Sequence, residues 1–120
     1  MMMIDTRRFN ILLKVLRRVE KDPNKPFTLE NWQQDAIGYL VSSPEGKKEG
    51  LSLEEMTDWY SDEPIDTVVF GEYCGWGAVM DFFNIEFYEA KSLFSPEYYP
   101  KDYSLQDVIV RIENFIEDKR

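Results

Sequence analysis

The chain has 120 residues, of which 43% are hydrophobic and 15% aromatic, and this composition supports a folded core and excludes a disordered polypeptide. The net charge of −9 disfavours direct binding of nucleic acid, because phosphate groups would be repelled unless a strong basic patch were present. The absence of histidine excludes Ser-His-Asp and Cys-His catalysis and every zinc site that uses histidine. We expect a single domain over residues 1–120, without a metal or another cofactor.

The sequence also bears on the compartment. The one cysteine, Cys74, cannot form an intrachain disulfide, which fits a reducing environment. The segment MMMIDTRRFN lacks the charged and apolar regions of a signal peptide. No stretch approaches the ~20 apolar residues of a membrane-spanning helix. We therefore expect a cytoplasmic protein that does not bind a membrane.

The first predicted element is a helix over about residues 5–21. Its apolar residues recur with the spacing of one helical face: Phe9, Leu12, Leu13, Leu16 and Val19. Basic side chains fall on another face, and the following sequence DPNKP ends the helix because proline cannot continue it. This pattern predicts an amphipathic helix that packs on the core.

A second helix is predicted over residues 28–41, with Thr28 as a favourable N-cap. Gly38 lies near its middle, where it should cost about 1 kcal/mol relative to alanine. We expect close approach of another helix to compensate for this cost.

The next segment, residues 52–60, reads as a third helix. Ser52 and Glu55 have the spacing of a capping box, and Met56, Trp59 and Tyr60 would face inward. Residues 67–70, TVVF, are mostly β-branched, but no partner strand follows them. They are therefore predicted as a short extended segment and not as part of a sheet.

Three further helical segments are predicted in the second half of the chain. YCGWGAVMDFF reads as a buried helix that ends at Asn84 in a left-handed conformation, and EFYEAKSLF follows it. SPEYYP predicts a single turn, and Ser104 caps a helix that continues toward Arg120. The expected fold class is all-α, with about five or six short helices around one core and an extended segment near residues 67–70.

Two blocks of the sequence carry a family resemblance: LLKVLRRVEKDPNKPFTLENWQQDAIGYL and AVMDFFNIEFYEAKSLFSP. Together they resemble a loose group of small uncharacterised bacterial and phage proteins, in which an amphipathic helix precedes a Trp, a small-residue helix and a later E-A-x-x-L-F motif. The matching residues are Trp32, Gly38, Tyr39, Asn84, Glu89, Ala90, Leu93 and Phe94. The cysteines that precede the glycine in that group are missing here. The group has no established activity, so the resemblance implies a fold and a bacterial or phage context only.

Charged residues are unevenly distributed. Residues 1–25 contain seven Lys or Arg and three Asp or Glu, whereas residues 26–120 contain seven and twenty. No Lys or Arg occurs between Glu49 and Ala90, a stretch with eleven carboxylates. We expect the basic N-terminal helix to be solvated or paired with the protein's own acidic surface, and not to bind nucleic acid or a membrane.

The segment LEEMTDWYSDEPID, residues 53–66, contains six of these carboxylates, and two interpretations of it are open. It is either a capped helix whose carboxylates face water, or a docking surface for a basic protein partner. In the second case an exposed aromatic side chain would anchor the partner. The candidate partner-binding residues are Glu54, Glu55, Asp58, Trp59, Tyr60, Asp62, Glu63 and Asp66.

No catalytic, cofactor-binding or metal-binding residue is assigned. The acids of residues 58–66 do not match a calcium loop, and the glycine-rich GEYCGWG lacks the lysine of a phosphate loop. Cys74 has no histidine to activate it and is expected to be a small buried residue.

The leading hypothesis is a non-enzymatic acidic interaction protein. The alternatives are a nucleic-acid mimic that inhibits a DNA- or RNA-binding protein and, last, an enzyme that uses only carboxylates and tyrosine.

Overall fold

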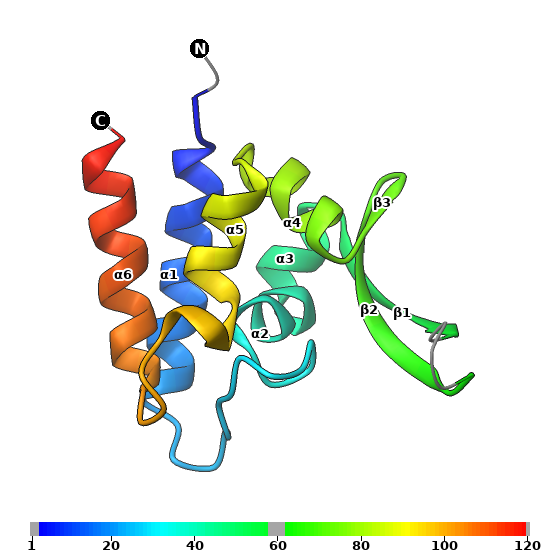
Figure 1. Ribbon diagram of the computed structural model, residues 1–120, viewed down its shortest axis with the longest axis horizontal. Coiled ribbons are helices and arrows are strands. Elements are labelled where there is room, and N and C mark those ends of the chain that lie inside the picture. Colours follow the sequence, from blue (N-terminus) through cyan, green and yellow to red (C-terminus); the bar gives the residue numbers. More distant parts are fainter. Residues whose placement is uncertain (1–2, 58–61, 120) are drawn as a thin grey trace.

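The computed structural model describes residues 3–57 and 62–119, which form a mixed α/β fold (Figure 1). The helices are α1 (Thr6–Glu20), α2 (Ala36–Ser42), α3 (Pro44–Lys48), α4 (Trp76–Phe83), α5 (Phe87–Phe94) and α6 (Leu105–Asp118), with a 3-10 turn, η1, at Pro96–Tyr98. The strands are β1 (Leu51–Thr57), β2 (Pro64–Phe70) and β3 (Tyr73–Cys74), in an antiparallel sheet of order β1-β2-β3. The expectation of an all-α fold was wrong.

The error lies in the segment predicted as the third helix. Its described part is β1, and the residues predicted as an isolated extended segment form most of β2. Leu51 and Val68 are buried against the core, so tertiary packing overrides the local capping-box pattern of Ser52 and Glu55. TVVF pairs with β1, which precedes it in the chain, and its last two residues also pair with the short β3, which follows it, although no partner strand was expected. Trp59 and Tyr60 lie outside the described residues.

The predicted second helix also begins later than expected. Residues 28–35 form turns, and α2 starts only at Ala36, with Asp35 and not Thr28 as its N-cap. Gly38 does lie at a close contact, but its neighbour is the backbone of the preceding turn and not another helix. A Cβ atom at this position would lie 2.1 Å from the carbonyl oxygen of Trp32.

The remaining helices agree with the sequence except α3, which lies in a segment that the proline, glycines and charges at residues 42–50 predict as a loop. α1 and α6 occupy the predicted segments, and Ser104 forms a capping box with Asp107 at the start of α6. Asn84 ends α4 in the left-handed conformation, at φ 55° and ψ 55°. In contrast, Cys74 lies in β3 with an exposed side chain, so its predicted burial was wrong.

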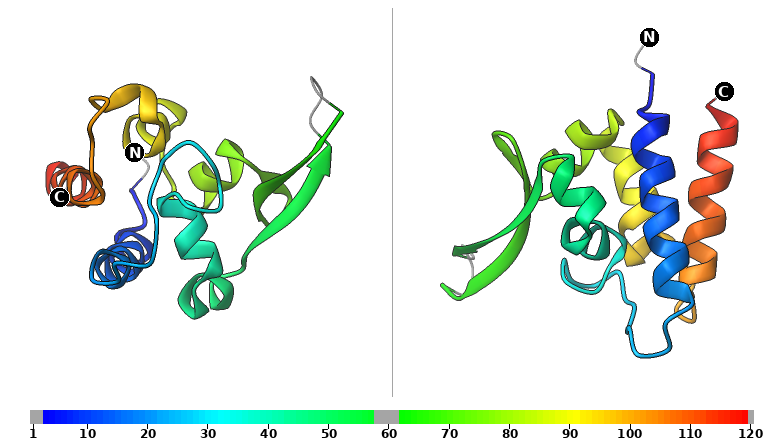
Figure 2. Two further views of the ribbon diagram at one scale, coloured as in Figure 1. Left: turned by 90° about the horizontal axis from the view of Figure 1, so that it is seen from below. Right: turned by 180° about the vertical axis from the view of Figure 1, so that it is seen from behind.

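The core lies between the helices and the root of the β1–β2 hairpin. Phe9 of α1 stacks on Phe83 of α4 at a centroid distance of 4.3 Å, and Phe94 of α5 stacks on the same ring. α1 and α6 run side by side on the opposite side of the molecule from the hairpin, whose far end projects from the helical body (Figures 1 and 2). Within residues 3–57 and 62–119, none of the helices combines the length and the hydrophobicity that a membrane span requires.

The basic side chains of α1 form ion pairs within the protein. The sequence predicted that they would be either solvated or paired in this way. Arg7 and Arg8 bind Glu49, and Lys14 and Arg18 bind Glu45. The hydrogen bond from Arg18 is the main reason that the pKa of Glu45 lies below its ordinary value. Four basic side chains of α1 are thus paired with one acid of α3 and with the residue after it.

Candidate functional site

A hollow of about 470 Å³ separates the far half of the hairpin from the turns before α2. We call it the acidic groove. It is lined by Glu30, Asn31, Trp32, Gln33, Glu55, Pro64, Ile65 and Asp66. It therefore combines acids from two segments that are more than twenty residues apart in the sequence.

The register of the hairpin directs two of these acids into the groove. Successive side chains of a strand point to opposite faces, so Leu51, Leu53 and Glu55 share one face of β1. Leu51 is buried in the core, and Leu53 packs at its edge. On β2, Asp66 lies directly opposite Glu55. The core-facing side of the hairpin thus becomes acidic where it extends beyond the helices.

The turns before α2 form the other wall. The side chain of Asn31 accepts hydrogen bonds from the backbone N–H groups of Gln33 and Gln34, at 3.1 and 2.8 Å. The amide of Gln33 donates to Asp66 Oδ2 at 2.6 Å, which ties this wall to β2. Local turns and one hydrogen bond between the walls therefore hold the groove open in a defined shape.

The acids of the groove and the acids near α1 differ in whether they form salt bridges with Lys or Arg. Among residues 3–57 and 62–119, no Lys or Arg forms a salt bridge with Glu30, Glu55 or Asp66. Glu45 and Glu49, by comparison, each bind two basic side chains of α1. Within the described residues, negative charge is therefore left without a basic partner in the groove, whereas Glu45 and Glu49 are paired with α1.

The sequence-predicted site residues that the structure describes separate into three groups. Glu55 and Asp66 meet in the acidic groove. Glu54 is exposed on the other face of β1, opposite Thr67 of β2, so it does not join them. Asp62 and Glu63 are exposed before the start of β2. The remaining candidates, Asp58, Trp59 and Tyr60, lie outside the described residues.

Sequence reasoning missed Glu30, Trp32 and Gln33, because it placed them within a helix. The signal that could have found them is the pair Asn31 and Asp35, two residues that favour turns and helix N-caps. If Asn31 is interpreted as part of a turn and Asp35 as an N-cap, the predicted helix begins at Ala36. Trp32 supplies the aromatic side chain beside the acids, a role that we expected of Trp59 or Tyr60.

A smaller hollow of about 180 Å³ adjoins the groove, and we call it the tryptophan cavity. It is lined by Leu29, Glu30, Asn31, Trp32, Asp35, Trp76 and Phe94, three of which also line the groove. The rings of Trp32 and Trp76 meet edge to face, with centroids 5.3 Å apart.

Asp35 is a buried carboxyl in the wall of this cavity, with only 3% of its surface exposed. Its Oδ1 accepts the backbone N–H of Gly38 at 2.6 Å, which caps α2. Burial raises the pKa of Asp35 to about 7, although the hydrogen bonds from Gly38 and Ile37 oppose the rise. A charge here is costly unless a cation accompanies it.

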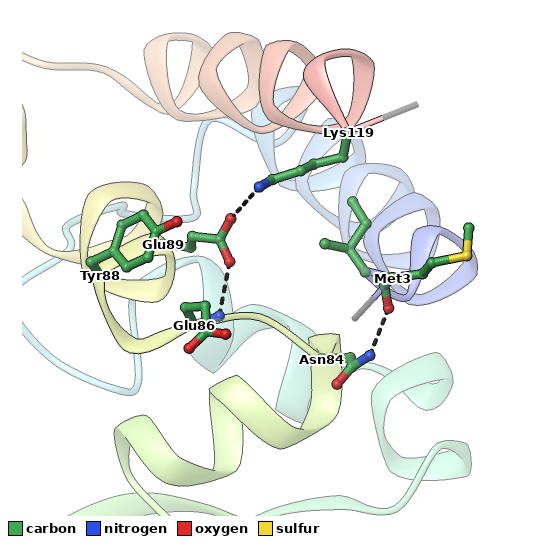
Figure 3. A pocket seen from close by; sticks show the side chains of 7 residues that line it. Met3, Asn84, Glu86, Tyr88, Glu89 and Lys119 are labelled. Atoms are coloured by element: carbon green, nitrogen blue, oxygen red, sulfur yellow. Dashed lines mark hydrogen bonds and ion pairs between the residues drawn. The ribbon is translucent and has the colours of Figure 1, made fainter. Parts of the chain in front are cut away.

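A third hollow, of about 360 Å³, lies where both ends of the chain meet α5 (Figure 3). Glu89 receives hydrogen bonds from Lys119 Nζ at 2.6 Å and from the backbone N–H of Glu86 at 2.9 Å. Burial alone would raise the pKa of Glu89, but these two donors hold it below the ordinary value. Asn84 donates to the carbonyl of Met3 at 2.6 Å. These contacts join Lys119 to α5 and Met3 to the end of α4, so we interpret this hollow as structural.

Comparisons of the chain with family models, with curated proteins and with solved structures found no match. Within the described part of the chain, no group of three or more Cys, Asp or Glu side chains could hold a metal ion. The geometry and charge of the groove and its adjoining cavity are therefore the features from which a function is inferred.

Proposed function

We propose that this protein is a non-enzymatic interaction protein that binds a basic segment of a protein partner in the acidic groove. The observation that carries the proposal is the convergence of Glu30, Glu55 and Asp66 on one hollow, without a neutralising Lys or Arg in the described chain. A basic partner would supply the missing positive charges, and complementary charge speeds association and rejects other partners. The single cysteine supports a reducing compartment, and we place this interaction in the cytoplasm.

The pairing of Glu55 with Asp66 favours a functional role for these acids. Like charges directly opposite each other on a hairpin are destabilising, by roughly 0.2–1 kcal/mol on the scale of cross-strand pairs. A bound cation would remove this repulsion. The unbound hairpin therefore carries an electrostatic cost that a basic partner relieves.

The form of the groove supports protein docking over the two alternatives. A nucleic-acid mimic needs acids spaced along a surface like the phosphates of a duplex, whereas here three acids gather in one hollow beside Trp32. Enzyme pockets are usually lined by apolar residues with a few convergent polar groups. Most of the residues that line this groove are polar or charged.

An NMR titration tests the proposal by locating the binding site. The probe is a short peptide with three arginines separated by glycine and serine, added to the isotopically labelled protein. We expect the largest shift changes at the backbone amides of Glu30, Trp32, Glu55 and Asp66, with saturation. Changes concentrated near Glu45, Glu49 or Glu113, or small changes over every acidic surface, would contradict the proposal. A matched peptide with the three arginines replaced by citrulline controls for uncharged contacts.

A further inference from the structure

We propose that one Arg or Lys side chain of the basic partner inserts into the tryptophan cavity, against the walls formed by Trp32 and Trp76, with its charged end toward Glu30 and Asp35. This inference rests on the proposed function and extends it, because it assigns one specificity-determining contact in addition to the general charge attraction of the groove.

The size and position of the cavity favour a single side chain. Its volume of about 180 Å³ is below the roughly 300–1,000 Å³ of typical small-molecule sites. Glu30, Asn31 and Trp32 line both hollows, so a chain lying in the acidic groove passes the entrance of the cavity. One long side chain of that chain can enter while its backbone stays in the groove.

The walls of the cavity match the two parts of a basic side chain. Leu29, Trp32, Trp76 and Phe94 provide apolar and aromatic surface for the methylene groups of the stem. Glu30 and Asp35 provide carboxylates for the charged end. An uncharged apolar side chain would fill the space but would leave a buried acid without a cation.

Trp76 already contacts one ammonium group of this protein. Lys91 Nζ lies 5.2 Å from the centre of the Trp76 ring, within the range of cation–π attraction. Lys91 is also paired with Glu97, at 2.9 Å, so its charge is compensated outside the cavity. The acids inside the cavity therefore remain available to a second cation.

The inserted cation should also stabilise the ionised form of Asp35. Its burial raises the pKa to about 7, so near neutral pH a large part of the population carries a proton there. A cation placed beside the carboxyl lowers its pKa, and the proton is released to solvent. Binding of the basic side chain should therefore be accompanied by proton release near neutral pH.

The test uses single amino acids first. N-acetyl-arginine amide and N-acetyl-citrulline amide, which differ in charge but hardly in shape, are each added at millimolar concentration to protein labelled at its tryptophan indoles. We expect the arginine compound to shift the indole N–H signals of Trp32 and Trp76 saturably, and the citrulline compound to leave them unchanged. Equal shifts with the two compounds, or none with arginine, would overturn the inference.

Two variants then separate this inference from the proposed function, with the three-arginine peptide as the probe. Asp35→Asn keeps the size and the capping oxygen but removes the charge, and Trp76→Leu removes one aromatic wall. We expect each to weaken peptide binding at least about fivefold, with circular dichroism confirming the fold. Unchanged affinity in Asp35→Asn, with peptide shifts still located in the groove, would refute the cavity contact and leave the proposed function intact. Failure of the peptide to bind the wild-type protein would contradict both.

Discussion

Glu55 and Asp66 lie directly opposite each other in the antiparallel register of β1 and β2, on the face that continues from the core. Two like charges thus share one cross-strand position, and Asp66 has the amide of Gln33 as a hydrogen-bond donor. This relationship joins the fold to the proposed function, because two opposed carboxylates repel each other and a bound cation would relieve that repulsion.

Reversal of one of these charges should stabilise the fold. Glu55→Lys replaces repulsion with a cross-strand ion pair to Asp66, and we expect the free energy of unfolding to rise by about 0.2–1 kcal/mol. The control is Glu54→Lys, which makes the same charge change opposite the uncharged Thr67. Urea denaturation of both variants is the measurement. An equal gain in the two variants would show that only net charge matters and would contradict the pairing argument.

Asp35 should make the stability depend on pH. Its pKa in the folded protein, about 7, lies above the ordinary value of about 3.9 for an unfolded chain. At pH values between these two pKa values, Asp35 is protonated in the folded protein and ionised in the unfolded chain. Stability conferred through Asp35 should therefore fall by a few kcal/mol as pH rises from about 4 to about 7, and then level off.

The Asp35→Asn variant isolates this effect, because asparagine is as good an N-cap as aspartate and does not titrate. Other acids act in the opposite sense at lower pH. The hydrogen bond from Arg7 lowers the pKa of Glu49, and the bond from Lys91 lowers that of Glu97, so their contributions are lost as pH falls below the ordinary range. The difference in unfolding free energy between wild type and variant should widen from pH 5 to pH 7 in favour of the variant. A constant difference would mean that Asp35 does not titrate in this range.

Substitution of Gly38 should destabilise both the helix start and the groove wall. Any Cβ atom there would lie 2.1 Å from the backbone oxygen of Trp32, so the turn must shift. We expect Gly38→Ala to lower the free energy of unfolding by about 1–3 kcal/mol, the usual cost of overpacking.

Gly77 in α4 is the matched control, since a Cβ atom there would meet only the side chain of Tyr73, at 3.7 Å. Gly77→Ala should be neutral or stabilising by up to about 1 kcal/mol, because alanine favours helices. Thermal melts of both variants make the comparison. A higher melting temperature for Gly38→Ala would argue against the close contact.

Cys74 should contribute little to stability, because its side chain is exposed in β3. Cys74→Ser is expected to change the free energy of unfolding by no more than about 0.5 kcal/mol. The thiol should also react with a thiol-specific reagent in the native protein, at a rate close to that of the unfolded chain. A slow reaction limited by unfolding would show that the side chain is protected.

Regular amphipathic helices could be predicted from the sequence, since each depends on a pattern within its own segment. α1 and α6 follow from apolar spacing, and Ser104 and Asn84 follow from local backbone preferences. The hairpin could not be predicted in this way. Residues 51–57 contain helix-favouring Leu, Glu and Met, and their strand conformation depends on pairing with β2 and on burial of Leu51.

The site was predicted in part for the same reason. Glu55 and Asp66 were among the candidates because of the acidic stretch, but no local pattern indicates that they face Trp32 across a groove. This arrangement depends on the turns at residues 28–35, a segment that the sequence had predicted as part of a helix. Glu54 was included because charge counts do not distinguish the two faces of a strand.

Association kinetics with the three-arginine peptide decide whether the acidic groove binds a basic partner. The groove variant is Glu55→Gln with Asp66→Asn. The control is Glu54→Gln with Glu72→Gln, which removes the same charge at two exposed positions outside the groove. Rates are measured at ionic strengths of about 0.01 M and 0.15 M, where the Debye length falls from about 30 Å to about 8 Å. We expect the groove variant to associate at least about tenfold more slowly than wild type at low salt, the control to change little, and salt to slow the wild type steeply. Equal association rates for the groove variant and the control would contradict the proposed function.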